Sequence, residues 1–500
     1  MALSRFWVAL FLCSIAYLLV QLFTGRYYTI EFAVSGKKDD PLLQREYYLD
    51  KLPPELQGSL QSASDHKITF DNKEYQYTID NEVLKLYAGK QAADGVVPQC
   101  KTTIFEILLP LIAYLSFFSG ILQLLIDSGA AERVAKLLSP IFVHVFPDVP
   151  RGHPSISYMT LNFAANFLGL DSAATPFGLK AMESLQELND QKDRASNPQI
   201  MFMCLHAAGL TLLPTSIIGY RAAAHATNPA DVMLPCIITS FIGTVAALVL
   251  VGIRQRINLF KATIVIAIGG ITAVIAALLV YITRLDLISK SHFTGNLSNG
   301  LLLGLIFAIF GYSLLREKQF AAKGTTIFNS FVEGAYNGLA VGRIIFPYIL
   351  GMLVAISLFR NSGLFEMFAA ALARTFRAVH VSDQIVNALP IAILRPFNSA
   401  GSRGFLLDAM YTYGADSFTG RLGCVFQCAA ETTFYVIAVY FGSVKIKNTR
   451  YALSTMLLVD LICVFAAIFV CLAFFDIVGR CSWRALAALQ RTAEVWLTDL

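Results

Sequence analysis

The sequence has 500 residues, of which 56% are hydrophobic, 12% aromatic and only 15% charged. Soluble proteins have a charged share of about 25%, so this composition excludes an ordinary soluble protein and indicates a polytopic membrane protein. The formal net charge of +5 does not indicate nucleic-acid binding, because no basic run is interleaved with aromatic residues that could stack on bases.

The chain begins with a single charge, Arg5, and an apolar segment that ends at Phe23. No small-residue cleavage site follows this segment, which favours an uncleaved anchor over a signal peptide. The polar stretch after it contains residues that alternate between apolar and polar from Ile68 to Ile79, around a turn at Asp71 and Asn72, which predicts a β-hairpin. Leu49 to Ser62 adds a short helix. We therefore expect a small α+β domain inserted after the anchor.

The remainder of the chain is dominated by apolar runs near the ~20 residues that cross a bilayer as a helix. With the N-terminal anchor, nine spans are expected: Phe6–Phe23, Ile104–Ile126, Ile200–Tyr220, Val232–Ile253, Ala262–Ile282, Leu301–Leu315, Leu339–Phe359, Arg421–Phe441 and Ala452–Phe475.

Two further apolar segments, Ser155–Met182 and Asn387–Met410, are interrupted by proline, glycine and polar residues. Basic residues mark cytoplasmic loops. They gather near Arg254, Arg316 and Lys445, while the loops 222–231 and 412–420 contain no lysine or arginine. These loop charges agree with one another only if both interrupted segments enter and leave the membrane on the same side. We therefore predict two re-entrant hairpins, which are tolerated where they line a cavity.

The two halves of the chain repeat one plan. Ser128-Gly129 with Glu132 is matched by Ser362-Gly363 with Glu366, and the polar residues of the hairpins and following spans recur at similar offsets. An additional span between the halves would invert the second repeat, as in many secondary transporters. The expected organisation is all-α with two inverted repeats: 1–29 anchor, 30–100 extracytoplasmic insert, 101–260 first repeat, 261–298 linking helix, 299–477 second repeat and 478–500 amphipathic tail.

The first hairpin and the span after it supply polar residues at membrane depth, where they are expensive and usually functional. The alternative is that they only cap half-helices. Pro214 is expected to break the span that follows. The candidate solute-binding residues of this half are Asn162, Asn166, Asp171, Ser172, Thr175, Thr211 and Thr215.

The second hairpin carries two arginines whose planar guanidinium groups suit a carboxylate or phosphate. The next span, expected as a continuous helix from Gly423 to Tyr440, carries a lone Glu431. This carboxylate could couple a proton or sodium ion to transport, or be locked to an arginine in a structural ion pair. The candidate residues are Arg395, Asn398, Ser399, Ser402, Arg403, Gln427, Glu431, Thr432 and Thr433.

Cys424 and Cys428 share a helix face and could hold a soft metal ion, but two cysteines without a nearby histidine do not make a closed site. His206 is interpreted as a packed residue first and a functional one second, and Asp460 in the last span has no assigned role. No nucleotide-binding glycine loop, metalloprotease helix or serine–histidine motif is present, so enzyme activity is not expected and no cofactor beyond a coupling ion is implied.

Long strings of this chain resemble a known family. The segments 166–189 and 209–222 are similar to spore maturation protein A, and 331–366, 389–405 and the region around Glu431 resemble spore maturation protein B. The chain thus looks like a fusion of the two. The resemblance implies the nucleoside-recognition or gate-domain group, which includes concentrative nucleoside transporters and ferrous iron permeases, with paired hairpins and broken helices around a substrate site. The insert and the linking span depart from the shorter members.

Three hypotheses remain at this point. The first is a permease for a polar, nucleoside-like, anionic or zwitterionic solute across the inner membrane, with a cytoplasmic N-terminus. The second is a non-transporting scaffold or regulator of an envelope process resembling spore maturation, with an envelope partner for the insert. The third is a divalent-metal permease. The bilayer is the expected surroundings, nucleic acid is not an expected partner, and a homo-oligomer is compatible with the sequence.

Overall fold

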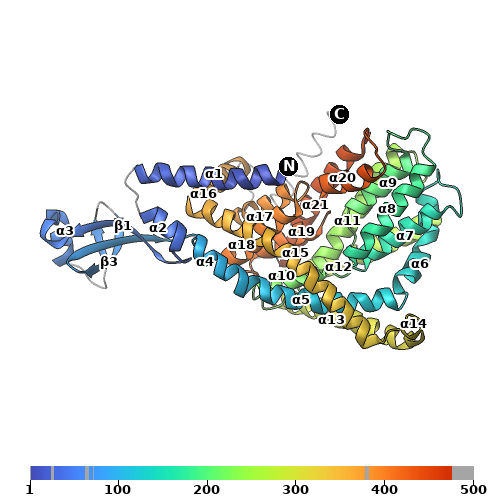
Figure 1. The fold of residues 1–500 in the computed structure, drawn as a ribbon, viewed down its shortest axis with the longest axis horizontal. Helices are drawn as coiled ribbons and strands as arrows, with labels where there is room; N and C mark the ends of the chain where they lie inside the picture. Colours follow the sequence, from blue (N-terminus) through green and yellow to red (C-terminus); the bar gives the residue numbers. More distant parts are fainter. Residues whose placement is uncertain (1, 24–27, 62–66, 71–72, 378–381, 476–500) are drawn as a thin grey trace. The chain divides into compact units, whose positions relative to one another are not determined.

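The computed structural model describes residues 2–23, 28–61, 67–70, 73–377 and 382–475 (Figure 1). The expected amphipathic tail, 478–500, lies outside these ranges. The chain divides into two units, one of residues 1–106 with 349–372 and one of residues 107–348 with 373–500. Each unit is described by itself.

The first unit contains the insert, and its sheet confirms the predicted β-hairpin. Strands β2 (Lys67–Phe70) and β3 (Lys73–Asp80) pair antiparallel, with Ile68 opposite Tyr75, and the turn between them lies outside the described residues. Strands β1 (Pro41–Tyr48) and β4 (Val83–Lys90) complete a sheet of order β1-β4-β3-β2. Helix α3 (Pro54–Gln61), preceded by the short turn η1 (Leu49–Lys51), covers it, and Leu56, Leu84 and Leu86 are fully buried in the core between them.

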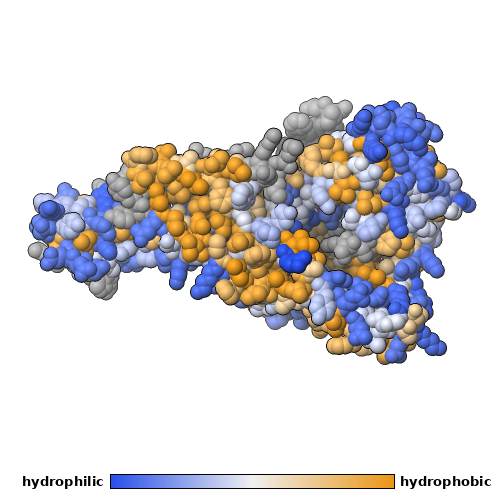
Figure 2. Space-filling model, viewed as in Figure 1, coloured by the Kyte–Doolittle hydropathy of each residue, from blue (hydrophilic) through white to orange (hydrophobic). Residues whose placement is uncertain are grey.

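The same unit holds apolar helices. Helix α1 (Ala2–Phe23) packs beside the last turns of α15 (Ile327–Asn361), where the indole Nε1 of Trp7 donates to the carbonyl oxygen of Gly351 at 2.9 Å. Short helices α2 (Tyr28–Ser35) and α4 (Val96–Thr102) connect α1 and the sheet to the first long span. Hydrophilic side chains dominate the surface of the sheet region, whereas hydrophobic ones cover α1 (Figure 2). This contrast is that of a water-exposed domain joined to a lipid-facing helix.

The second unit is helical, and the order of its elements follows the predicted repeat. The elements that follow the π-helical turn η2 (Thr103–Leu108) are α5 (Leu109–Asp127), α6 (Ala130–Val145), α7 (Pro154–Phe167), α8 (Asp171–Glu187), α9 (Asn197–Ala207), α10 (Thr215–Ala223), α11 (Met233–Arg254), α12 (Ala262–Arg284), α13 (Leu287–Leu315), α14 (Glu317–Ala322), α15 (Ile327–Asn361), α16 (Leu364–Arg377), α17 (Asp383–Leu394), α18 (Ser399–Tyr413), α19 (Phe418–Cys428), α20 (Thr433–Ser443) and α21 (Ala452–Phe475). Parts of α15 and α16 belong to the first unit.

Both interrupted segments fold as helical hairpins. Helices α7 and α8 form the first one and pack closely on each other, and α17 and α18 form the second (Figure 1). Gly169 lies in the turn that joins α7 to α8 and has a φ of +79°, a conformation that glycine adopts without strain. Gly129 and Gly363, which matched in the sequence repeat, also share positive φ values of 72° and 82°.

Seven helical segments in the described chain are long and apolar enough to cross a membrane: Val96–Asp127, Met233–Arg254, Ala262–Arg284, Ile288–Leu315, Ile327–Asn361, Phe418–Ser443 and Ala452–Phe475. Seven of the nine expected spans have a counterpart among these segments, and helix α1 (Ala2–Phe23) covers an eighth, Phe6–Phe23. The expectation is corrected at Ile200–Tyr220, which is not one helix but two, α9 and α10.

The expected continuous helix from Gly423 to Tyr440 is also wrong. Helix α19 ends at Cys428 and α20 begins at Thr433, so Glu431 lies in a break between two half-helices. Each repeat therefore contains one hairpin and one broken helix. Much of the second unit's core, which includes Met201, Ala247, Phe441 and Met456, joins helices of both repeats.

Candidate functional site

The two broken helices meet at their breaks. Gly209, just after the end of α9, has a φ of +59°, and Pro214, immediately before α10, cannot donate a backbone hydrogen bond. In the second repeat, Glu431 lies between α19 and α20, and its backbone N–H donates to the carbonyl oxygen of Ala207 at 2.8 Å. The end of α9 and the break after α19 are thus joined through the main chain.

Each hairpin tip is tied to the break of its own repeat. The carbonyl oxygen of Phe167, at the end of α7, accepts from the backbone N–H of Leu212 at 2.7 Å. In the second repeat, the carbonyl oxygen of Pro396 accepts from the backbone N–H of Phe434 at 3.0 Å. The two hairpin tips and the two breaks therefore converge on one region. Helices end there, so backbone N–H and C=O groups without a partner in their own helix can hydrogen-bond other groups.

A cavity of about 630 Å³ lies at this convergence. Its wall includes residues of both hairpins, both breaks and the spans α5 and α15. The residues expected at a solute site that line it are Asn166, Thr211, Thr215, Arg395, Ser399, Arg403, Gln427 and Glu431.

Arg395 follows the last turn of α17 and is held on several sides. Its Nε donates to the carbonyl oxygen of Ala430 at 2.7 Å, and Nη1 donates to the hydroxyls of Ser399 at 2.9 Å and Thr432 at 3.3 Å. Its Nη2 lies 3.7 Å from Oε2 of Glu431. The arginine side chain is 11% exposed and that of Glu431 41%. The ion pair is loose and faces the cavity, whereas the other contacts fix the guanidinium in place.

The second arginine lies one turn along α18. Arg403 Nε donates to the carbonyl oxygen of Ser399 at 3.3 Å, and Nη1 donates to the hydroxyl of Tyr220 at 3.4 Å. Behind it, the hydroxyl of Ser402 lies 2.6 Å from Oε1 of Gln427. This contact orients the Gln427 side chain, which lines the cavity.

The first repeat contributes a neutral polar cluster. His206 Nδ1 lies 3.1 Å from Oδ1 of Asn162 and 3.0 Å from Nδ2 of Asn166. Asn162 Nδ2 in turn donates to the carbonyl oxygen of Ala174 at 2.7 Å, which links the two arms of the hairpin. His206 was interpreted as a packing residue, and its ring does pack on Tyr440, but it also holds the side chain of Asn166, which lines the cavity.

Several expected site residues lie behind the cavity wall. Asn398 caps α18 by accepting from the backbone N–H of Ala400, and Thr433 donates to Asp460 at 2.7 Å. Thr175, Ser402 and Thr432 are likewise not among the residues that line it. The side chains of Asp171 and Ser172 lie outside the described residues.

The cysteine pair is divided between two environments. Cys428 lines the cavity, whereas Cys424 is buried with its Sγ 3.8 Å from Sδ of Met410. Within the described part of the chain, no group of three or more histidine, cysteine and acidic residues is placed to hold a metal ion.

Sequence reasoning missed Gln123 on α5 and Asn337 on α15, both of which line the cavity. Their signal was available, since amides within apolar spans are uncommon and tend to face a bundle interior.

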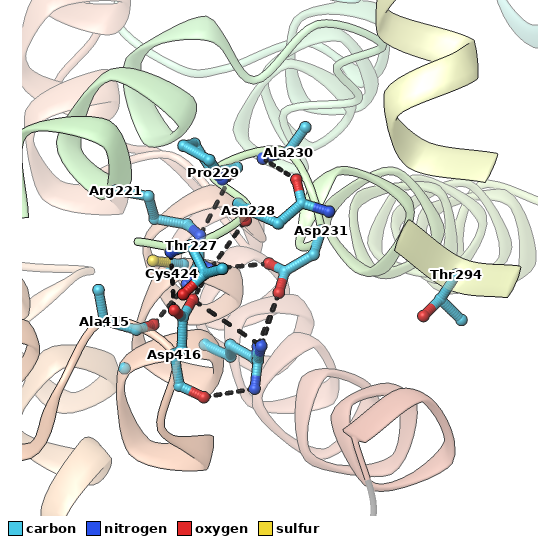
Figure 3. Close-up of polar contacts among 12 residues, drawn as sticks. Arg221, Thr227, Asn228, Pro229, Ala230, Asp231, Thr294, Ala415, Asp416 and Cys424 are labelled. Atoms are coloured by element: carbon cyan, nitrogen blue, oxygen red, sulfur yellow. Dashed lines mark hydrogen bonds and ion pairs between the residues drawn. The ribbon is translucent and has the colours of Figure 1, made fainter. Parts of the chain in front are cut away.

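A buried charge network joins the two repeats (Figure 3). Arg221, at the end of α10, is completely buried and lies 2.8 Å from Asp231 and 2.9 Å from Asp416. Its guanidinium also donates to the carbonyl oxygens of Ala415 at 2.6 Å and Asn228 at 3.1 Å. Arg421 completes the set at 2.8 Å from Asp231. Two arginines and two aspartates balance, as buried charges must.

Asp416 lies in the loop before α19, outside the spans. Burial raises the pKa of its carboxyl, but the larger combined effect of the backbone N–H of Thr227, which donates at 2.7 Å, and of the two arginines lowers this pKa. The net pKa lies below the ordinary value of 3.8. Asp416 is therefore ionised at neutral pH and contributes a charge to the network.

The geometry of hairpins and broken helices is accompanied by similarity to known proteins. The family model described as Gate: Nucleoside recognition matches residues 108–224 and 343–447, and each region contains one hairpin and one broken helix. Spore maturation protein B of Bacillus subtilis (strain 168) is 40% identical over 153 residues, which are 31% of this chain and 84% of that protein. The chain belongs to the Gate, or nucleoside recognition, family.

A second relative of this Gate-family protein is spore maturation protein A of the same organism. It is 34% identical over 140 residues, which are 28% of this chain and 71% of that protein. No solved structure matches the chain. The similarity to both spore maturation proteins bears out the resemblance drawn from the sequence, and the chain is a multi-pass membrane protein of this family.

Proposed function

We propose that this Gate-family protein is a secondary transporter of a small polar solute, nucleoside-like and anionic or zwitterionic, which binds between the two hairpins. The observation that carries the proposal is the cavity of about 630 Å³ at the convergence of both hairpin tips and both helix breaks. Its volume falls within the ~300–1,000 Å³ of small-molecule sites. Broken helices around a central site are a recurring feature of secondary transporters.

The charged residues suggest how the solute is held. The guanidinium groups of Arg395 and Arg403 bind its anionic group, because planar donors of this kind suit carboxylate and phosphate oxygens. Glu431 pairs loosely with Arg395, at 3.7 Å, and yields that position to the solute. The remaining hydroxyl and amide groups hydrogen-bond the neutral part of the solute; these are Asn166, Thr211, Thr215, Ser399 and Gln427.

We further propose a cytoplasmic N-terminus, an extracytoplasmic insert and re-entrant hairpins. This orientation follows from the basic loops near Arg254, Arg316 and Lys445 and from loops 222–231 and 412–420, which contain no basic residue. It makes the two repeats inverted with respect to each other.

The test begins with the purified full-length protein. A thermal-shift screen against nucleosides, amino acids, dicarboxylates, lipid phosphates and divalent metals identifies a stabilising compound, and counterflow of the labelled compound into proteoliposomes measures transport. Arg395→Ala is expected to lose stabilisation and transport. Glu431→Gln removes the carboxylate that competes with the solute for Arg395 and is expected to increase stabilisation and alter transport, and Arg151→Ala, at an exposed loop position, is expected to leave both at the wild-type level. The proposal is wrong if Arg395→Ala and Glu431→Gln leave both readouts at the wild-type level.

A second function is favoured by one observation, the independent core of the insert. Its sheet packs on α3 around Leu56, Ile68 and Leu84, so the insert has a core of its own, and the alternative proposal is that it binds an envelope partner. In that case the protein is an envelope scaffold, and deletion of residues 30–85 abolishes function while substitutions at Arg395 do not.

A further inference from the structure

Asp460 is a buried carboxylate that the proposed solute site does not use. It lies in the apolar span α21 and is 8% exposed. The hydroxyl of Thr433, at the start of α20, donates to its Oδ2 at 2.7 Å. Within the described ranges, no basic side chain lies within 4.0 Å of the Asp460 carboxylate. The positive charge of Arg395 acts on this carboxylate from a longer distance. A charged carboxylate in this position is costly unless another charge balances it.

A second, much smaller cavity adjoins this carboxylate. Its volume is about 20 Å³, and Asp460 and Arg395 both line it. This volume holds about one water molecule. The rest of the wall is largely apolar and includes Pro396, Phe426 and Val464. A sodium ion would need several oxygen ligands and would face the guanidinium, so the site suits water and a proton better than a metal cation.

Arg395 connects the small cavity with the large one. It lines both, and in the large cavity its Nη2 faces Glu431 at 3.7 Å. The positive charge of one guanidinium therefore acts on two carboxylates, Glu431 and Asp460. The three groups carry a net charge of −1 when both acids are ionised. One bound proton restores neutrality, which removes the penalty of an unbalanced buried charge.

The other groups near Asp460 do not supply a compensating cation. Two thiols interact with it electrostatically, Cys204 of α9 and Cys463 on α21 itself. Among the further helices that pack on α21, α11 and α12 carry no acidic, basic or histidine residue except the arginine that ends each. Helix α13 carries its Lys290 and His292 in its first two turns. Helix α19 carries one cation, Arg421, which pairs with Asp231 at 2.8 Å and lies over the ring of Phe475. Helix α9 carries His206, whose Nδ1 lies beside Asn162 and Asn166, and α20 carries no acidic, basic or histidine residue.

We propose that Asp460 binds the coupling proton of this transporter and that Arg395 transmits the coupling. The inference rests on the proposed function. A hydronium ion that reaches the small cavity gives one proton to an oxygen of Asp460: an O–H bond of the hydronium ion breaks, an O–H bond to the carboxylate forms, and a water molecule and a neutral carboxylic acid result. Release is the reverse transfer to water. An anionic solute on Arg395 offsets the positive field that stabilises the Asp460 anion, so solute and proton bind together. By linkage each increases the affinity of the other.

The proton site is tested without any solute by infrared spectroscopy of the purified full-length protein. The absorption of protonated carboxyl groups is followed from acidic to alkaline pH. Asp460→Asn is expected to remove one titrating carboxyl band, and Glu431→Gln is expected to leave that band in place. Thr433→Val, which loses the donor to the anion, is expected to move the band's loss to higher pH. An unchanged band in Asp460→Asn overturns the inference, and so does a band that only Glu431→Gln removes.

The coupling is tested by transport with the compound found in the thermal-shift screen. Wild-type uptake is expected to accelerate when a proton gradient drives it, whereas Asp460→Asn is expected to retain solute exchange and lose that acceleration. Equal acceleration in both proteins overturns the inference. If the wild-type protein transports nothing, the proposed function fails, while the infrared titration still decides whether Asp460 binds a proton.

Discussion

The buried network around Arg221 gives the sharpest test of how the two repeats are held together. We consider Arg221→Met, which keeps most of the side-chain length and removes the guanidinium. The wild-type group lies 2.8 Å from Asp231 and 2.9 Å from Asp416, and it donates to the carbonyl oxygens of Ala415, Asn228 and Pro229 at 2.6, 3.1 and 3.2 Å. Its loss leaves three carbonyl oxygens without this donor and the network with a net charge of −1.

Removing one partner of a buried ion pair costs about 3–5 kcal/mol, because the remaining charge stays buried. Asp231 retains Arg421 at 2.8 Å, and Asp416 retains the backbone N–H of Thr227. We therefore expect Arg221→Met to lower the free energy of unfolding by about 3 kcal/mol, the lower end of that range.

The assay is equilibrium unfolding in mixed micelles with increasing denaturing detergent, followed by circular dichroism. Arg151→Met is the matched control, because this arginine lies in an exposed loop, and it is expected to change stability by no more than about 0.5 kcal/mol. The double variant Arg221→Met, Asp416→Asn is expected to be less destabilised than the sum of the two single variants, since both belong to one network. Equal stability of Arg221→Met and Arg151→Met would refute this account.

Three other predictions concern a carboxylate, a glycine and a thiol. The folded-state pKa of Asp416 lies below 3.8. The contribution of its ionised carboxylate to the free energy of unfolding is therefore complete above pH 3.8 and is lost as the pH falls through the lower folded-state pKa. The difference in unfolding midpoint between wild type and Asp416→Asn should shrink on acidification, and a difference that grows contradicts the assignment. In Gly169→Ala the new Cβ lies 2.6 Å from the carbonyl oxygen of Leu213, whereas in the control Gly152→Ala, at a similar φ of +83°, the new Cβ has no atom within 4 Å. Gly169→Ala should therefore be less stable than Gly152→Ala by about 1–3 kcal/mol in thermal unfolding. Equal losses would show that the hairpin contact is unimportant. In single-cysteine variants, Cys428 should react with a small water-soluble thiol reagent and Cys424 should not, because of these two only Cys428 lines the cavity. Mass spectrometry measures the modification. The reverse order of reactivity would contradict the position of the cavity.

The hairpins and the first helix break could be predicted because they are encoded locally. Gly169 and Pro214 interrupt apolar segments, and each acts through its own backbone, by a positive φ or a missing donor. The β-hairpin of the insert was likewise encoded by alternation around a polar turn.

The second helix break could not be predicted, because Ala429 to Thr432 contains neither proline nor glycine. It is stabilised by tertiary contacts instead. The carbonyl oxygen of Ala430 accepts from Arg395, and the N–H of Glu431 donates to Ala207. These partners replace helical hydrogen bonds, and they become visible only when the hairpin and the other repeat are in place.

Long-range pairing also hid the charge network. Arg221 and Asp416 are 195 positions apart and lie beside loops that were used only to infer membrane orientation. Side chains that line the cavity were predicted at Arg395 and Asn166, which lie in segments that proline and glycine interrupt. Gln123 and Asn337 were missed although an amide within an apolar span is also a local signal, because neither lies in an interrupted segment.

The junction of the hairpin tips and helix breaks is made largely by the main chain, through the pairs Leu212 with Phe167, Phe434 with Pro396 and Glu431 with Ala207. Contacts of this kind place few demands on side-chain identity. A duplicated gene could therefore have accumulated different chemistry in its two halves without losing the shared architecture. Gly209 of the first repeat and Glu431 of the second show how far matched positions can diverge, with the first remaining neutral while the second carries a charge.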